Sequence, residues 1–139
     1  MQHGKTMGEL LKRFYEQWLA ASKEAANPVY FRGEDRIASA MQQLGMELVR
    51  PGAEARIEFW SPARGSLSGA WISEPPQGGE AIQRVFGSAF QGLHPGSPFV
   101  VLHRREDPRG LLAWLRQAGF EVVSQGAGPE GSALLARRL

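Results

Sequence analysis

Apolar residues recur along the first part of the chain at three- and four-residue steps, which is the pattern of an amphipathic helix. Thr6 and Glu9 form a capping box that predicts where this helix begins, and Asn27-Pro28 predicts where it ends. The expected buried face consists of Leu10, Leu11, Phe14, Trp18 and Leu19. Such an aromatic face is more typical of a hydrophobic core or a subunit contact than of a ligand site.

The next segment alternates between short strand-like runs and one helical pattern. Residues 29–31 predict a strand, and apolar steps from Ile37 to Leu48 predict a helix. Residues 55–59 alternate apolar and polar side chains, which predicts a strand with one solvated face. Residues 1–65 are therefore expected to form a helical and βαβ extension. A degenerate internal repeat is an open alternative, because VRPG here and LHPG later each separate a predicted helix from a predicted strand.

The second half of the chain has the clearer pattern. Residues 67–72 predict a strand, and an apolar stripe over residues 82–90 predicts a helix that lies on a sheet. Residues 99–102 are apolar on both faces, as expected of a central strand.

The remaining elements close this unit. Asp107 predicts the start of a second helix, and Gly119 predicts its end. Residues 120–122 and Leu134 belong to two closing strands, which a glycine-rich loop at residues 126–131 joins and which are therefore expected to be antiparallel. The order β-α-β-α-β-β predicts an α/β fold of the two-layer sandwich type.

Composition limits the class of protein. The 139 residues include no cysteine, which excludes disulfides, thiolate nucleophiles and cysteine-ligated metals. The net charge of +2 and the isoelectric point near 9.4 are only a weak indication of a nucleic-acid partner. The sequence begins without a secretory-signal pattern and has no apolar run long enough to span a bilayer, so we expect a cytoplasmic protein without a membrane partner.

Residues 69–75, Gly-Ala-Trp-Ile-Ser-Glu-Pro, stand where the TusA-like sulfur-carrier family has its Gly-Leu-x-Cys-Pro-x-Pro signature. The Pro-Gly turn, the Asp-Pro helix start and the Gly-Phe helix end also resemble this family, and above all its DUF2249 branch, whose signature is proline-rich. The resemblance implies a TusA-like domain over residues 66–139 and a link to bacterial redox or sulfur metabolism. Ile72 replaces the persulfide cysteine, so sulfur-relay chemistry is not implied for this chain.

Two places along this unit are candidates for ligand binding. One is the helix start after Glu74, where the helix dipole and the glycines favour an anion. The other is the charged segment 103–107, which follows the predicted central strand at the end where α/β sheets bind ligands. The candidate ligand-binding residues are Trp71, Glu74, Pro75, Gly78, His103, Arg104, Arg105 and Arg109. No motif indicates a catalytic residue, a metal site or a particular cofactor.

The favoured hypothesis is a non-catalytic binding protein of TusA-like type, rather than an enzyme, that takes a small anionic ligand, a cofactor or a protein partner. Self-association through the first helix is compatible with it. One alternative is an RNA-binding module, with a basic face built from Arg104, Arg105, Arg109, Arg116, Arg137 and Arg138. Another is a cryptic enzyme centred on His103, Glu106 and Asp107.

A further alternative is a degenerate methyltransferase-like domain. Residues 95–123 and the following strand pair resemble the closing third of class I methyltransferases. Those enzymes bind their cofactor on a glycine-rich loop after the first strand, whereas here that loop holds the single glycine Gly33.

Overall fold

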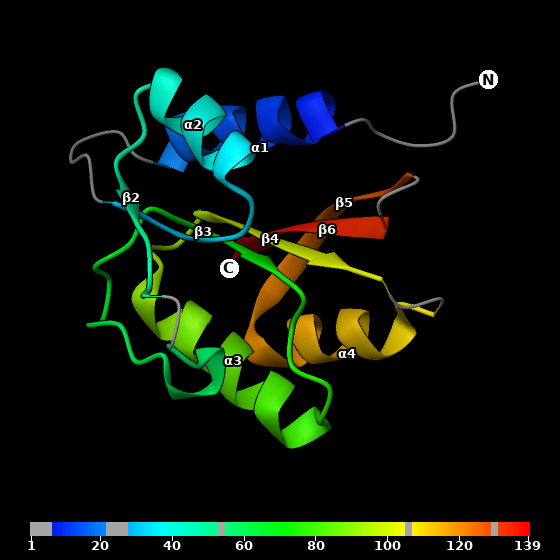
Figure 1. The fold of residues 1–139 in the computed structure, drawn as a ribbon. Coiled ribbons are helices and arrows are strands. Elements are labelled where there is room, and N and C mark those ends of the chain that lie inside the picture. Colours follow the sequence, from blue (N-terminus) through cyan, green and yellow to red (C-terminus); the bar gives the residue numbers. More distant parts are fainter. Residues whose placement is uncertain (1–6, 22–27, 53–54, 105–106, 129–130) are drawn as a thin grey trace.

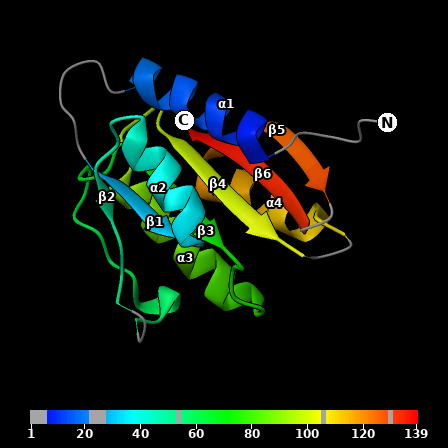
Figure 2. The same cartoon turned by 45° about the horizontal axis from the view of Figure 1, so that its top comes forward.

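The computed structural model describes residues 7–21, 28–52, 55–104, 107–128 and 131–139. These residues form one mixed sheet with helices on both of its faces (Figures 1 and 2). In chain order the elements are α1 (Met7–Ala21), β1 (Val29–Arg32), α2 (Asp35–Gln43), β2 (Leu48–Val49), the 3-10 helix η1 (Ile57–Phe59), β3 (Gly69–Ser73), α3 (Gly79–Gly92), β4 (Pro98–His103), α4 (Arg109–Ala118), β5 (Phe120–Gly128) and β6 (Gly131–Arg138).

The six strands lie in the order β2-β1-β3-β4-β6-β5. Strands β2, β1, β3 and β4 are parallel to one another, and β6 is antiparallel to both β4 and β5. The first two strands thus pair into the same sheet as the last four. Helices α1 and α2 cover one face, and α3 and α4 cover the other (Figure 1).

This arrangement confirms the α/β class but not the predicted two-layer sandwich. Strand β3 is buried from Gly69 to Ile72, and β4 is buried from Pro98 to Val101. Because successive side chains of a strand point to opposite faces, such strands need cover on both sides. The N-terminal helices supply that cover on the second face, so the molecule has three layers.

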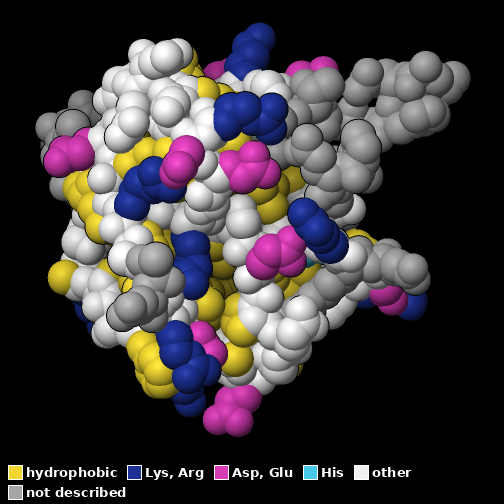
Figure 3. Space-filling model, viewed as in Figure 1, with side chains coloured by type: hydrophobic (Ala, Val, Ile, Leu, Met, Phe, Trp, Pro, Cys, Tyr) yellow, Lys and Arg dark blue, Asp and Glu magenta, His cyan; other side chains and the backbone are white. Residues whose placement is uncertain are grey.

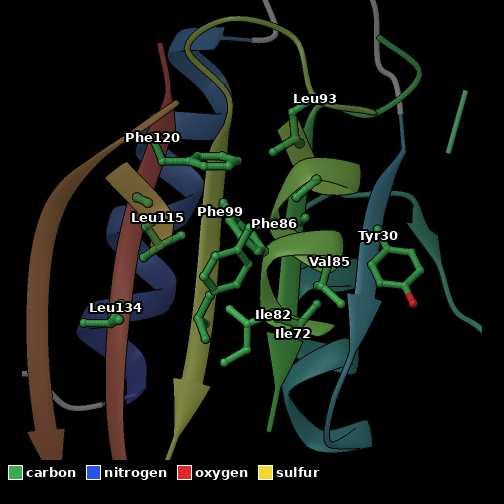
Figure 4. Packing of buried hydrophobic residues seen from close by; sticks show 14 of the residues in the cluster. Tyr30, Ile72, Ile82, Val85, Phe86, Leu93, Phe99, Leu115, Phe120 and Leu134 are labelled. Atoms are coloured by element: carbon green, nitrogen blue, oxygen red, sulfur yellow. The ribbon is translucent and has the colours of Figure 1, made fainter. Parts of the chain in front are cut away.

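Each face of the sheet has its own hydrophobic core. On the face of α3 and α4, Phe99 of β4 contacts Phe86 edge-on at a ring-centroid distance of 5.6 Å. The centre of the Phe120 ring lies 5.1 Å from that of Phe99 (Figure 4). On the other face, Phe14 of α1 meets Trp71 of β3 edge-on at 5.4 Å. The apolar stripes of the helices therefore follow the predicted periodicity where they meet the sheet.

Helix α1 is fixed to the sheet layer by a buried polar contact as well. Trp18 Nε1 donates a hydrogen bond of 2.9 Å to Ser68 Oγ, just before β3. Leu10 and Phe14 are buried with Trp18, but Leu19 is 49% exposed, so its predicted place on the buried face is wrong. Thr6, half of the predicted capping box, lies outside the described residues.

The predicted strand at residues 55–59 is also wrong. Here the chain forms η1, in which Ile57 is buried and Phe59 is 68% exposed. The two residues are an even number of positions apart and would share one face of a strand, whereas in a helical turn they point apart. The predicted loop at residues 126–131 is shorter than expected, because β5 and β6 stay paired as far as Gly128 and Gly131.

Candidate functional site

The strand order creates one place where two crossovers leave the sheet in opposite directions. The chain passes from β1 through α2 on one face, and from the neighbouring β3 through α3 on the other. Ligands of open α/β sheets bind outside the carboxyl ends of the strands at such a switch point. We call the residues at the ends of the four parallel strands the carboxyl edge; they are Arg32, Gly33, Glu34, Asp35, Arg50, Ser73, Glu74, His103 and Arg104.

Acidic and basic side chains alternate with hydrophobic surface on the side of the molecule seen in Figure 3. Several of the charges at the carboxyl edge are paired. Arg50 lies 2.7 Å from Asp35, Arg36 of α2 lies 3.6 Å from Glu34, and Arg104 lies 3.3 Å from Glu74. The edge is therefore a mixed charged surface and not a patch of one sign.

The corner between β1 and α2 is closely packed. A Cβ atom on Gly33 would lie 2.9 Å from the Oγ of Ser73, so the glycine makes room for this chain's own β3. Arg50, which follows β2, reaches across the corner: its Nη2 donates to Asp35 Oδ1 at 2.7 Å and to the Gly33 carbonyl at 3.4 Å. The guanidinium carbon also lies 5.4 Å from the centre of the Phe31 ring. We call this arrangement the Arg50 closure.

Glu74 follows β3 directly and has a left-handed backbone, with φ of 55°. Its N–H donates to the carbonyl of Leu102 on β4 at 2.8 Å, which holds the backbone in place. Pro75 after it is buried, and Gly78 after that is exposed. A Cβ on Gly79 would lie 3.2 Å from the ring of Trp114, so that glycine serves the packing of α3 on α4.

His103 ends β4 and is only 2% exposed, whereas Arg104 beside it is exposed. Asp107 accepts a hydrogen bond of 3.0 Å from the backbone N–H of Arg109, the first residue of α4, but the N-cap position of this helix is Pro108 and not Asp107. The Arg109 guanidinium and that N–H together lower the pKa of Asp107 from 3.8 to about 2. Arg105 lies outside the described residues.

Trp71 is fully buried between Phe14 and Phe31, and among the described residues its indole Nε1 has no hydrogen-bond partner. Glu74 and Arg104 thus meet at the carboxyl edge, and Trp71 stays in the core.

On the α3 face of β1, Tyr30 stacks on Trp60 at a ring-centroid distance of 4.1 Å. Burial raises the pKa of Tyr30, and a hydrogen bond with the neighbouring Arg32 opposes that rise.

A hollow of about 430 Å³ lies along α1 and is lined by Glu9, Lys12, Arg13, Glu16 and Gln17. All of these lining residues come from a single helix.

Most of the arginines proposed for an RNA-binding face contact other side chains of this protein. Arg104 pairs with Glu74, Arg109 with Asp107 and Arg137 with Glu121. Arg138 lies over the ring of Phe90 at 4.0 Å. RNA binding and self-association through α1 stay predictions. The apolar side chains of α1 that would supply such a contact, Leu10, Phe14 and Trp18, are buried in their own chain.

In the part of the chain that the structure describes, no three histidine or acidic side chains gather in a way that could hold a metal ion. Nor is any helix in that part long and apolar enough to cross a membrane.

Solved structures that resemble this chain in fold include several methyltransferases. The glycopeptide N-methyltransferase MtfA, complexed with S-adenosyl-L-methionine, matches with a TM-score of 0.61 and 16% identity over 91% of this chain and 87% of that chain. The 1,6-didemethyltoxoflavin-N1-methyltransferase of Burkholderia thailandensis, bound to S-adenosylhomocysteine, matches with a TM-score of 0.65 and 14% identity over 90% and 77%. Geranyl diphosphate methyltransferase with sinefungin matches with a TM-score of 0.67 and 9% identity over 92% and 78%. No protein-family model and no curated protein sequence matches this chain.

These likenesses correct the sequence-based hypotheses. The resemblance to the TusA-like and DUF2249 families is wrong, and the suggested link to sulfur metabolism falls with it, because the structural neighbours are methyltransferases. The Pro-Gly turn and the Gly-Phe helix end that carried the resemblance are features of many βαβ units. The prediction of a non-catalytic binding protein is contradicted as well, since the neighbours are enzymes. The methyltransferase-like alternative is the better supported, and the fold is that of the methyltransferases.

Proposed function

We propose that this chain is a degenerate methyltransferase-like domain whose ligand site lies at the carboxyl edge. The observation that carries the proposal is the switch point between β1 and β3 in a sheet that ends in the antiparallel pair β5–β6. Neighbours with this fold were solved with S-adenosyl-L-methionine, S-adenosylhomocysteine or sinefungin. We call the domain degenerate because its loop after β1 lacks the glycine-rich cradle that such a cofactor would need.

The residues of this loop do not fit an adenosyl cofactor. A cradle requires backbone that a ligand can approach closely, which glycines provide. Gly33 is the single glycine between β1 and α2, and Ser73 Oγ already fills the space beside it. The Arg50 closure covers the β2 side of the same corner.

The charge at the start of α2 also disfavours binding of an adenosyl cofactor. A helix N-terminus attracts an anion such as a ligand carboxylate. Here Glu34 at the N-cap position and Asp35 in the first turn place two carboxylates of the chain itself at that end. A second anion would be repelled by them, so we derive no methyl-transfer step through this corner.

An active methyltransferase that uses S-adenosylmethionine is the second candidate, and the bound ligands of the structural neighbours favour it. The two candidates differ in whether the closed corner admits the adenosyl group. Calorimetric titration of the purified protein with S-adenosylhomocysteine separates them.

We expect no saturable binding, which corresponds to a Kd weaker than about 1 mM and a binding free energy smaller than about 4 kcal/mol in magnitude. A known methyltransferase titrated in the same buffer serves as the positive control. Saturable binding at one ligand per chain with a Kd near 1 μM, about 8 kcal/mol, would reject the degenerate form and support the second candidate.

A further inference from the structure

Phe59 of η1 is the most exposed of the large apolar side chains that the structure describes. Its exposed fraction is 68%, whereas Ile57, two residues earlier, is buried in the core beside α3. The guanidinium carbon of Arg56 lies 5.4 Å from the centre of the Phe59 ring, so it covers only one face of that ring. Aromatic side chains that become buried on association are frequent anchors of protein interfaces. The other face of the ring is therefore available to a partner.

The apolar surface around Phe59 extends to the edge of the sheet. Trp60, which follows it in the chain, is only partly buried and stacks on Tyr30. Val49 on the edge strand β2 pairs with Tyr30 and is 44% exposed. Because paired residues of two strands point to the same face of a sheet, Val49 and Trp60 both border Tyr30 on the α3 face. Val49, Trp60 and Phe59 thus lie together at the β2 edge.

Two opposite charges accompany this apolar surface. Arg56 Nη2 donates to Glu58 Oε2 at 3.0 Å, and the two side chains are 67% and 24% exposed. Exposed ion pairs contribute little to stability, so this pair can change partners at small cost.

The charges also indicate which partner fits. An acidic partner such as a nucleic acid would meet the carboxylate of Glu58, which repels it. A complementary partner presents one cation and one anion beside an apolar side chain. A second copy of this chain presents that combination, because in a two-fold interface the same surface contacts itself.

We propose that the protein forms a two-fold symmetric dimer through the η1 surface, which consists of Val49, Arg56, Glu58, Phe59 and Trp60. The two Phe59 rings pack together near the axis, and Arg56 of each copy pairs with Glu58 of the other. A standard stable interface uses about 20–30 residues of each partner, so we expect a weak and reversible dimer. The inference is independent of the proposed function, because none of these residues belongs to the carboxyl edge.

Sedimentation equilibrium of the full chain tests the proposal. As the protein concentration rises from about 1 μM to about 1 mM, we expect the average mass to rise from 15.3 kDa towards that of a dimer. A chain that stays monomeric over this range overturns the proposal and leaves the η1 surface to a different partner.

A pair of variants locates the contact. Phe59→Ser removes an exposed side chain, so the fold is kept, and we expect it to weaken dimerisation at least about tenfold. Leu19→Ser is the matched control, because Leu19 is 49% exposed but lies on α1. It should leave dimerisation unchanged. Dimerisation that Leu19→Ser weakens as much as Phe59→Ser does would overturn the assignment to η1.

Charge exchange tests whether the partner is a second copy in this arrangement. Arg56→Glu and Glu58→Arg each bring like charges together across the axis, so each variant alone should dimerise more weakly than the wild type. In an equimolar mixture of the two variants every glutamate meets an arginine of the other protein, and association should return. A mixture that associates no more strongly than the separate variants would reject the proposed ion pairs.

Discussion

Asp107 and Arg109 are joined by side-chain and backbone hydrogen bonds at the start of α4. The Arg109 Nε lies 3.0 Å from Asp107 Oδ2 and its Nη2 lies 2.8 Å from the same oxygen, while the Arg109 backbone N–H donates to Oδ1. All of these bonds favour the ionised carboxylate, so the pKa falls from 3.8 to about 2. Because the folded-state pKa is the lower one, the pair contributes stability above pH 3.8, and this contribution is lost as the pH falls through about 2.

We predict that Arg109→Ala raises the pKa of Asp107 toward 3.8 but not fully, because the backbone N–H still donates. The measurement is an NMR titration of the Asp107 side-chain carboxyl carbon in the wild type and the variant. Arg116→Ala, in the last turn of the same helix, is the control and should leave this pKa unchanged. Equal titration of Asp107 in all three proteins would contradict the assigned cause.

Single residues that act locally could be predicted from the sequence, and residues that act across the sheet could not. Gly119 was correctly identified as the helix end, and Asp107 lies one residue before the observed N-cap Pro108, because helix termini depend on nearby residues alone. Arg50 and Ser73 were missed, and Gly33 was noted only as the single glycine of its loop, since the contacts of these residues join three strands. No local pattern marks an arginine that will cover a phenylalanine 19 positions earlier in the chain.

At the scale of elements, Gly119 connects α4 to β5 and shapes the core between α3 and α4. Its φ is 106°, and a Cβ there would lie 2.5 Å from a ring carbon of Phe90 on α3. The same ring also contacts Arg138 of β6, whose guanidinium carbon lies 4.0 Å from the ring centre. The Phe90 ring therefore has little freedom to move away from an added methyl group.

We predict that Gly119→Ala destabilises the fold by about 2–5 kcal/mol, the sum of left-handed strain and overpacking. Gly45→Ala is the matched control, because Gly45 has φ of 94° but nothing within 4 Å of its added Cβ. It should cost only the strain, about 1–2 kcal/mol. Urea unfolding of the two variants measures the difference. Equal losses of stability would show that Phe90 does not restrict the site.

Most helices and strands follow from the periodicity of the sequence, but residues 55–59 do not. The pattern at residues 82–90 was correct because α3 presents a continuous apolar stripe to the sheet. The alternation at residues 55–59 was misleading, since Ile57 packs beside α3 instead of entering the sheet. A short alternating run does not distinguish a strand from an irregular segment that buries one side chain.

At the scale of the whole molecule, the sequence could not decide between two folds that share their local elements. The β-α-β-α-β-β order of the second half is present, from β3 to β6. The two folds differ in the arrangement of the whole sheet. In this protein β1 and β2 extend the same sheet, and α1 and α2 cover its second face. Leu102 on β4 and Leu135 on β6 pack on that second face, but a reader of the sequence cannot see which helix covers them.

The central claim is that this methyltransferase fold has a closed corner between β1 and α2. A crystal structure of the protein grown with S-adenosylhomocysteine tests it most directly. We predict that Arg50 lies over Phe31 and against Asp35, that Gly33 packs on Ser73, and that no adenosyl group occupies this corner. S-adenosylhomocysteine bound against Gly33, with Arg50 displaced from Asp35, would contradict the claim.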